Sequence, residues 1–368
     1  MTNTSFERPR CWTVDDYDEL RRKIFYPKTD LMAPDETLRA IKSRSAEELG
    51  ITNEILARVG AHWLGEKPTV APLAEQGTFH RLFRLTLPDG RRFVMRINAA
   101  NNLYRDFSMY QDLWLSERMG HVGAPRVRAV DISYSRRQFE YEIFDEARGE
   151  SLTRLDDSDA ILGPLRLLGA AAARIHLQRF RGFGWFTLRP LHWAREVADV
   201  ALRGSDARWG DYLERNFERH ANVCRRIGAI TGEEQRRILA LFTQHARLWD
   251  DAPSALLHGD LGNHNVFTDG QRITAIIDWE DCLVGDPVYD IAFWATFHPE
   301  PRHAVFLEGY RQVVELPADF WLRFWLYFLR VSLAKTVHRH RFGYEDRPGR
   351  PPAARRIQLS LERLESAL

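Results

Sequence analysis

The sequence has 368 residues, of which 44% are hydrophobic and 12% aromatic, and its formal net charge is +1. This length and core content predict a globular protein of two lobes and exclude a disordered chain. A nearly neutral chain has no overall field that would draw it to nucleic acid or to an anionic membrane, so neither is expected as a partner. The three cysteines lie far apart without a CxxC pair, which excludes a zinc-finger or disulfide framework.

The sequence also lacks the usual features of export and membrane insertion. Its first residues contain no apolar signal segment, and the most apolar stretch, residues 320–329, is interrupted by Arg323. We therefore expect a cytoplasmic protein. Nothing in the sequence indicates its oligomeric state.

The basic residues are almost all arginine. Only five of the 52 basic residues are lysines, and none lies between Lys67 and Lys335. A bias in composition can produce this ratio by itself. It still means that any cation acting on a phosphate in the middle of the chain must be arginine.

Residues 1–65 predict a helical extension, with helices at 15–24, 35–43 and 52–64, the last capped by Thr52. Residues 66–147 predict a small antiparallel β lobe, because apolar and polar residues alternate on both sides of the turn sequence Pro88-Asp89-Gly90. Its strands are expected at 79–87, 92–97, 126–131 and 139–144, and a helix at 103–119.

Residues 148–368 predict a larger, mainly helical lobe. Its helices are expected at 160–180, 193–202, 211–227 and 233–249, and again from residue 287 onward. Short strands are expected between these two helical regions at 255–258, 265–268 and 272–278, the last two joined by a hairpin at Asp269-Gly270. The predicted fold class is therefore α+β.

The densest signal for chemistry lies around this hairpin. The segment HGDLGNHN covers residues 258–265, and IIDWE covers residues 276–280. The hairpin is expected to bring Asp260, Asn265 and Asp278 together at the ends of three strands. Two carboxylates and an amide form a hard-oxygen set that suits Mg²⁺ and phosphates rather than zinc. This spacing is typical of metal-assisted phosphoryl transfer.

A dinuclear metallophosphoesterase is a possible alternative, because Gly259-Asp260 and Gly262-Asn263-His264 match short pieces of its motifs. Those pieces normally lie on separate strand ends, so that they approach the metals from different sides. Here they are almost contiguous, and no upstream D-x-H segment accompanies them. Each polar residue alone could also simply fill a turn.

The same segments, followed by Gly285-Asp286-Pro287 and Asp290, resemble the aminoglycoside phosphotransferase family. The likeness runs from about residue 77 to about residue 309. It implies a two-lobed protein-kinase-like fold, ATP or GTP as phosphate donor, and Mg²⁺. By position it implies that Asp260 is the catalytic base, with Asn265 and Asp278 as metal ligands. His258 would brace the catalytic loop, and Asp286 and Asp290 would anchor it to the next helix.

On the nucleotide side, the resemblance implies that Gly77, Thr78, Phe79 and His80 form the loop over the phosphates. Glu142 to Phe144 would be the linker whose backbone pairs with adenine. Arg96 stands where the fold usually has a lysine, and a guanidinium can bridge phosphate oxygens. Its acidic partner is expected to be Asp106, with Glu117 as second choice. An exposed strand arginine is the alternative interpretation of Arg96.

On the acceptor side, Glu280 and Asp281 follow the expected metal ligand, and eight acidic residues lie within residues 140–160. Acids beside a pocket would suit a cationic small molecule with a hydroxyl group, such as an aminoglycoside. A solvated acidic face explains residues 140–160 equally well. A metabolic or biosynthetic kinase and a catalytically silent nucleotide-binding module remain alternatives.

Overall fold

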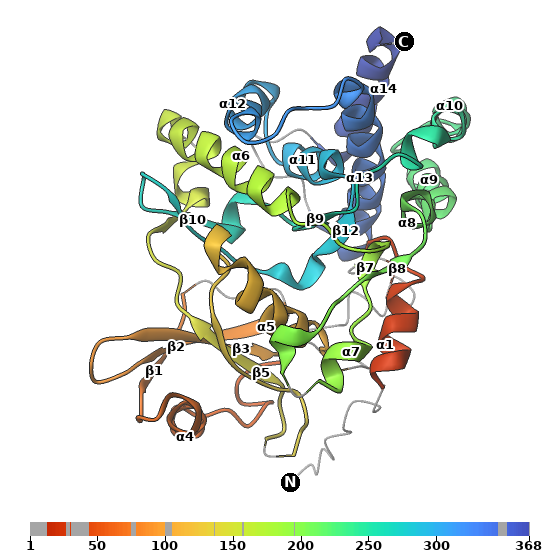
Figure 1. Cartoon of the computed structure of the whole chain (residues 1–368). Helices are drawn as coiled ribbons and strands as arrows, with labels where there is room; N and C mark the ends of the chain where they lie inside the picture. Colours follow the sequence, from red (N-terminus) through yellow and green to blue (C-terminus); the bar gives the residue numbers. More distant parts are fainter. Residues whose placement is uncertain are drawn as a thin grey trace. The chain divides into compact units, whose positions relative to one another are not determined.

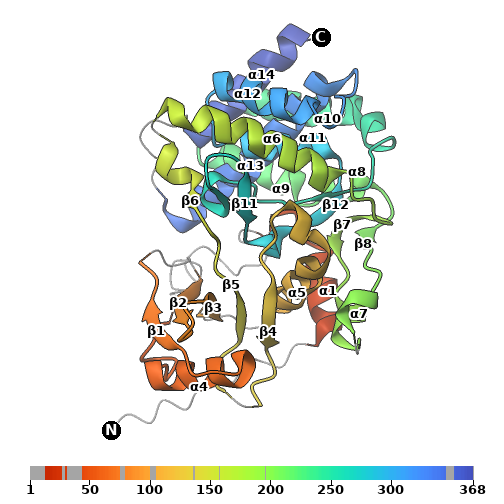
Figure 2. The same ribbon diagram turned by 60° about the vertical axis from the view of Figure 1, so that its left-hand side comes forward.

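A computed structural model describes residues 13–26, 30, 44–74, 79–99, 105–135, 137–156, 158–194, 196–344 and 352–367. The chain divides into two compact units (Figures 1 and 2). The first comprises Met1–Glu19, Ala40–Ala147 and Leu188–Val200; the second comprises Leu20–Arg39, Arg148–Thr187 and Ala201–Leu368. The division into an extension, a β lobe and a helical lobe at residues 65 and 147 stays a prediction.

The first unit contains the antiparallel sheet expected from the alternating pattern. Its strands follow the order β1-β2-β3-β5-β4. They are β1 (Thr69–Pro72), β2 (His80–Thr86), β3 (Arg92–Asn98), β4 (Val127–Asp131) and β5 (Tyr141–Asp145). The β2–β3 hairpin is closed at its turn by the hydrogen bond from Leu87 N to Arg91 O, 2.9 Å long.

Helices of the first unit cover this sheet. Helix α4 (Asn53–Leu64) begins as predicted, because the Thr52 hydroxyl accepts a hydrogen bond from Ile55 N at 3.2 Å. Its Leu56 and Val59 pack into one core with strand residues such as Met95. Helix α5 (Ser108–Met119) is shorter than the predicted 103–119, because residues 105–107 are not helical and residues 101–104 lie outside the described part. The short α7 (Arg189–His192) also belongs to this unit.

Helix α1 (Val14–Arg21) confirms the first predicted helix, although it ends earlier than residue 24. The boundary between the two units falls within it, after Glu19. The helix predicted at 35–43 lies outside the described residues.

The second unit is mainly helical. Its helices are α6 (Leu162–His176), α8 (Trp209–Leu213), α9 (Phe217–Arg226), α10 (Gly232–Gln244), α11 (Pro287–Ala295), α12 (Glu300–Arg311), α13 (Phe320–Phe342) and α14 (Ala353–Ala367). Helices α6 and α12 lie side by side (Figures 1 and 2). Their backbones approach closely at Gly169 and Gly309, where any side chain would collide with the other helix.

Two small sheets lie within this unit. One has the order β11-β10-β6 and the other β8-β7-β12-β9. Their strands are β6 (Glu150–Ser151), β7 (Phe183–Phe186), β8 (Gly204–Asp206), β9 (Ala255–Leu257), β10 (Val266–Thr268), β11 (Ile273–Ile276) and β12 (Leu283–Gly285). The hairpin predicted around Asp269-Gly270 is confirmed, since β10 and β11 pair with Val266 opposite Ile276.

Two helix predictions are wrong. Residues 193–202 contain only a 3-10 turn at Val197–Asp199 in the described part. The helix expected at 211–227 is divided into α8 and α9 at Asn216, whose φ of 53° is left-handed. Asparagine tolerates this conformation, and its Nδ2 donates to Lys23 O at 3.2 Å. None of the helices in the described part of the chain has the length and apolar character needed to cross a membrane.

Candidate active site

The predicted catalytic loop, residues 258–265, follows strand β9. His258, Gly259 and Asp260 come directly after Leu257, and a 3-10 turn at Asn263–Asn265 leads into β10. Ile277 N donates to Asn265 O at 2.9 Å, and Asn265 Nδ2 donates to Asp260 O at 2.9 Å. These bonds join Asp260 to Asn265, and Asn265 to the residue before Asp278. The hairpin therefore gathers the three residues as the sequence predicts.

Asp278 occupies an unusual backbone conformation. Its φ and ψ are 65° and 60°, a left-handed conformation that is uncommon for a residue with a side chain. The 3-10 turn Trp279–Asp281 follows, and Trp279 Nε1 donates to Ile276 O at 2.8 Å. Strained residues of this kind cluster at functional sites. The geometry therefore marks Asp278 independently of its motif.

His258 is fully buried, and burial lowers the pKa of its imidazole, although Asp290, Asp260 and Asp278 oppose this shift. Its Nδ1 accepts from Asp260 N at 3.3 Å, so the ring proton lies on Nε2, which donates to Ile277 O at 3.0 Å. A neutral ring thus links the Asp260 segment to the Asp278 segment. This is the bracing contact expected for His258.

Asp290, on α11, holds the start of the same loop. Its two carboxylate oxygens accept from His258 N at 2.9 Å and Gly259 N at 3.0 Å, and His176 Nε2 lies 3.1 Å away. Burial raises the pKa of Asp290, but the hydrogen bond and charge of His176 outweigh it, so the pKa is lowered. Asp286 caps α11 by accepting from Val288 N at 3.0 Å. The expected anchoring of the loop is confirmed for Asp290, whereas the contacts described for Asp286 are with α11 and α13.

Gly259 is required by the packing of this loop. Its φ is 80°, and a Cβ there would overlap the carbonyl oxygen of Asp281. The loop carrying Asp260 therefore lies directly against the turn that follows Asp278.

Arg96 lies in the first unit and is 6% exposed, so the interpretation as an exposed strand arginine is wrong. Its Nη2 is 2.5 Å from Asp112 Oδ2, and its Nε is 2.6 Å from Glu142 Oε1. The expected pairing with Asp106 is thus corrected to Asp112 and Glu142. Because α5 begins only at Ser108, the Asp106 carboxylate instead accepts hydrogen bonds from Ser108 and contacts His80 Nε2 at 3.4 Å.

Burial raises the pKa of Asp106, but its contacts with His80 and Ser108 and the charge of Arg96 bring it to about 2. Asp106 is therefore ionised at neutral pH and holds His80, the last residue of the predicted phosphate loop. Gly77 and Thr78, the core of that loop, lie outside the described residues.

The interpretation of Glu142 to Phe144 as a linker is wrong. These residues lie within β5, paired with β3 on one side and β4 on the other. Their backbone groups take part in the pairing of the sheet.

Glu280 and Asp281 are partly exposed in the 3-10 turn after Asp278, where the sequence predicts them. The acidic run at 140–160 is not a solvated face, because most of its described members are buried or paired. Glu140 and Glu142 are buried, while Asp145 pairs with Arg128 and Glu146 with Arg84. Asp157 lies outside the described residues.

Sequence reasoning missed the contacts that hold the middle of the catalytic loop. Asn263 Nδ2 donates to Asp156 Oδ1 at 2.6 Å, and Arg302 Nη1 lies 3.3 Å from the same oxygen. No sequence spacing joins positions 156, 263 and 302. The pairing of Arg96 with Glu142, in contrast, could have been found from the register of β3 and β5, in which the two residues are opposite each other.

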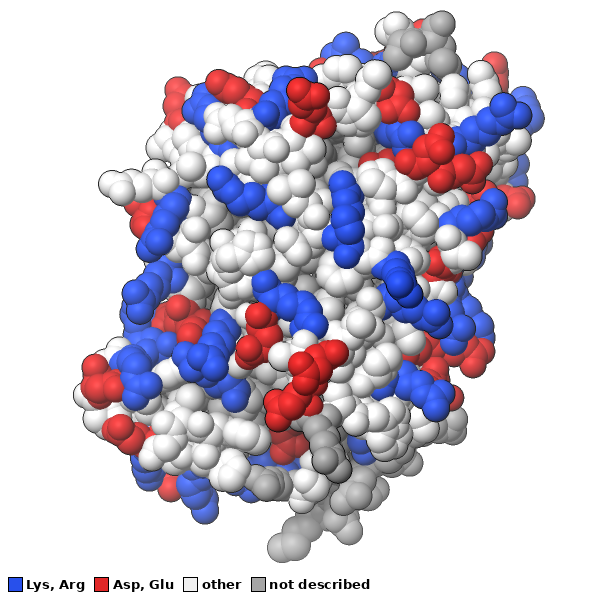
Figure 3. Space-filling model, in the orientation of Figure 1, with Lys and Arg blue, Asp and Glu red and all other residues white. Residues whose placement is uncertain are grey.

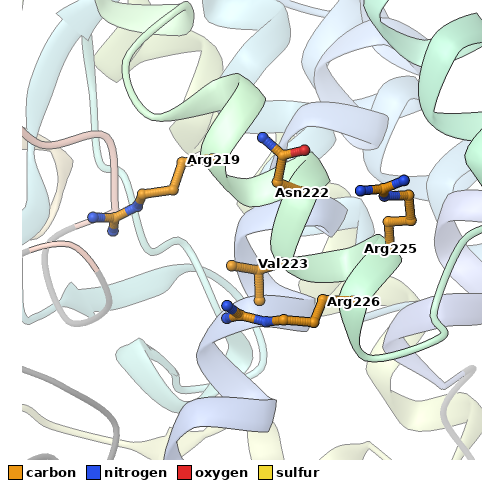
Figure 4. Close-up of a pocket in the computed structure, with 5 residues that line it drawn as sticks. All are labelled: Arg219, Asn222, Val223, Arg225 and Arg226. Atoms are coloured by element: carbon orange, nitrogen blue, oxygen red, sulfur yellow. The ribbon is translucent and has the colours of Figure 1, made fainter.

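A pocket of about 580 Å³ on α9 contains none of the candidate residues. It is lined by Arg219, Asn222, Val223, Arg225 and Arg226, whose side chains point to different sides of the helix (Figure 4). Among the described residues visible in Figure 3, acidic and basic side chains are interspersed over the face shown.

Residues 69–325 match the sequence pattern of the Phosphotransferase enzyme family. The match covers most of the chain. It includes Arg96 with its two acidic partners, and it includes the loop that carries Asp260. The chain therefore belongs to this family, as its motifs indicated.

One curated relative is similar to this chain in sequence. Hygromycin-B 4-O-kinase of Escherichia coli is 26% identical over 213 residues, which are 56% of this chain and 57% of that protein. The chain thus spans a little over half the length of this curated relative. The segments FVMRIN, RGFG and RITAIIDW also resemble hygromycin B phosphotransferase, which agrees with this match.

Solved structures share the fold. The aminoglycoside phosphotransferase APH(4)-Ia, in a ternary complex with AMP-PNP and hygromycin B, is 21% identical with a TM-score of 0.56. The comparison covers 84% of this chain and 98% of that one. A candidate fructosamine-3-kinase of Thermobifida fusca is 18% identical with a TM-score of 0.57, covering 85% and 100%. These likenesses confirm the kinase-like α+β fold.

Proposed function

We propose that the protein transfers a phosphoryl group from ATP or GTP, with Mg²⁺, to a hydroxyl group of a small molecule. The observation that carries this proposal is the gathering of Asp260, Asn265 and Asp278 around the β10–β11 hairpin. Family membership supports the reaction class. A cytoplasmic location, where nucleotide is available, stays part of the proposal.

Asp260 is the group that orients the acceptor hydroxyl and takes its proton. General-base catalysis of this kind contributes about 10²- to 10⁴-fold in rate. His258 and Asp290 act through the backbone, because their hydrogen bonds fix the segment on which Asp260 lies. The acceptor hydroxyl thereby meets a preorganised carboxylate.

Asn265 and Asp278 would hold the magnesium ion. Their oxygens suit this hard cation, and the bond from Asn265 Nδ2 to Asp260 O determines that the amide oxygen is the ligand atom. When bound, Mg²⁺ neutralises charge on the phosphates. Arg96 provides further positive charge, with its fork held in a fixed orientation by two acids.

An aminoglycoside-type antibiotic is the acceptor that we favour, since the curated relative is a hygromycin kinase. Glu280 and Asp281 would then face the cationic groups of the acceptor. A metabolic kinase for an amino alcohol, a sugar or a natural product is the second candidate, and the likeness to a candidate fructosamine-3-kinase favours it. A silent nucleotide-binding module would not need the complete Asp260, Asn265 and Asp278 set.

The test is incubation with ATP, Mg²⁺ and a panel of aminoglycosides, macrolides, amino alcohols and sugar amines, followed by mass spectrometry. We expect a phosphate-sized mass gain on an aminoglycoside. Asp260→Ala should reduce the rate by about 10²-fold or more with little change in Tm. Asp251→Ala, at an exposed position before β9, serves as the matched control. An unchanged rate in Asp260→Ala would overturn the assignment, and products only with amino alcohols or sugars would shift the acceptor class.

A further inference from the structure

The segment from residue 20 to residue 26 lies before the family match, which begins at residue 69, yet it belongs to the second unit. Its backbone is held by side chains of that unit. Trp185 Nε1 donates to Ile24 O at 3.0 Å, and Tyr212 Oη donates to Phe25 O at 2.9 Å. This part of the N-terminal extension is therefore built into the unit that contains Asp260.

Arg21 connects this segment to the turn after Asp278. Arg21 is only 3% exposed, and its guanidinium lies 4.4 Å from the centre of the Trp185 ring. Its Nη2 donates a hydrogen bond of 3.0 Å to the carbonyl oxygen of Glu280. A hydrogen bond from a charged donor is about twice as strong as a neutral one.

The position of this bond within the turn is specific. Glu280 is two residues after Asp278, whose left-handed backbone requires support from its surroundings. The next carbonyl, that of Asp281, packs against Gly259 of the catalytic loop. Strand β12 then continues from the turn, and its Leu283 pairs with Trp185, the residue on which Arg21 lies. Arg21 thus contacts the stretch from Asp278 to Leu283 at Glu280 directly, and at Leu283 through Trp185.

We propose that Arg21 is a positioning residue, which keeps the turn 278–281 in the conformation that presents Asp278 to the metal. The role of Asp278 rests on the proposed function, whereas the hold on the turn does not. The extension of this chain therefore contributes to the active site without touching nucleotide or acceptor.

Three variants test this proposal: Arg21→Ala, Arg21→Lys and the control Arg22→Ala, whose side chain is exposed on the adjacent position. Hydrogen–deuterium exchange of peptides covering residues 278–283 measures the hold on the turn directly. We expect about tenfold faster exchange there in Arg21→Ala, with no change in α13, and wild-type exchange in Arg22→Ala. Lysine keeps the charge and can still donate to a carbonyl oxygen, but it lacks the planar group that lies over Trp185, so Arg21→Lys should show an intermediate rate.

The second measurement is the Mg²⁺ concentration that gives half-maximal phosphate transfer. It should rise about tenfold in Arg21→Ala, while KM for the acceptor stays near that of the wild type. A purely structural role would instead lower Tm and total activity without this split. If Arg21→Ala does not fold, Arg21→Lys carries both measurements.

The experiments distinguish a failure of the proposed function from a failure of the role of Arg21. If Asp260→Ala keeps full activity, the proposed function is overturned, while the exchange experiment still judges the hold of Arg21 on the turn. If Asp260→Ala is inactive but Arg21→Ala and Arg21→Lys match Arg22→Ala in exchange and in Mg²⁺ dependence, the role of Arg21 alone is overturned.

Discussion

At the scale of one residue, the contacts of Arg96 depend on the shape of the guanidinium group as well as on its charge. A guanidinium presents several N–H donors in a rigid plane, whereas an ammonium is a compact charge on a flexible stem. In this chain one edge of the plane meets Glu142 on the neighbouring strand and another meets Asp112 on α5. The two acids fix the orientation of the group, so the residue is held in place as well as charged.

We expect Arg96→Ala to reduce kcat/KM for ATP by about 10²-fold or more, because it removes the charge and leaves two buried carboxylates uncompensated. Arg96→Lys should recover only part of this loss, since one ammonium cannot replace the planar fork. Steady-state kinetics with varied ATP measure both effects. Arg92→Ala, on the same strand and half exposed, is the control. Full activity in Arg96→Lys would show that charge alone is sufficient.

At the scale of elements, helix α11 determines where the catalytic loop lies. Asp286 caps the start of this helix and Asp290 lies in its first turn. Both carboxylates are buried and accept hydrogen bonds. Asp286 also accepts from Tyr327 Oη at 2.8 Å and pairs with Arg323 at 3.0 Å, both on α13. The loop is thereby connected through α11 to the longest described helix.

Asp290→Asn tests this connection. An amide has one acceptor oxygen, so it cannot serve His258 N, Gly259 N and His176 together. We expect a loss of about 1–3 kcal/mol in the free energy of unfolding, measured by urea denaturation, and a lower kcat with little change in KM for ATP. Glu308→Gln, in a surface ion pair of α12, should change both by far less. Equal effects of the two substitutions would contradict the anchoring role.

The elements that the sequence predicts well are those determined by local pattern. The hairpin of β10 and β11 brings Asp260, Asn265 and Asp278 together because its turn residues and alternation fix the register within a short stretch. The division of α8 from α9 at Asn216 could not be predicted, because the stabilising partner, Lys23 O, lies in a distant segment. The helical partner of Arg96, Asp112, depended on where α5 begins, and helix ends are the least certain part of a pattern.

At the scale of the whole molecule, two buried carboxylates, one in each unit, respond to pH in opposite directions. In the second unit, burial of Asp30 raises its pKa, but the hydrogen bond and charge of His220 outweigh this, and the pKa is well below the ordinary value. In the first unit, burial and the nearby charge of Asp106 raise the pKa of Glu140 to about 7. Asp30 therefore stabilises the fold near neutral pH and loses this effect in acid, whereas Glu140 does the reverse.

The sign for Glu140 follows from proton binding. A carboxyl group with a higher pKa in the folded state holds its proton more tightly there, so its contribution is complete below the unfolded pKa near 4.5 and is lost as pH rises through about 7. Above that pH, the fold must contain a buried charge, whose donors include Asn98 Nδ2 at 2.8 Å and Asp106 N at 3.1 Å.

Glu140→Gln removes this charge while its amide oxygen can still accept from both donors. We expect the variant to gain about 2–3 kcal/mol in unfolding free energy at pH 8, and much less at pH 5, where the wild-type group is mostly protonated in the fold. Thermal unfolding followed across this pH range measures the difference. Glu117→Gln, exposed on α5, should show no pH-dependent gain. A Glu140→Gln variant that is equally stabilised or destabilised at both pH values would show that the buried group does not titrate with folding.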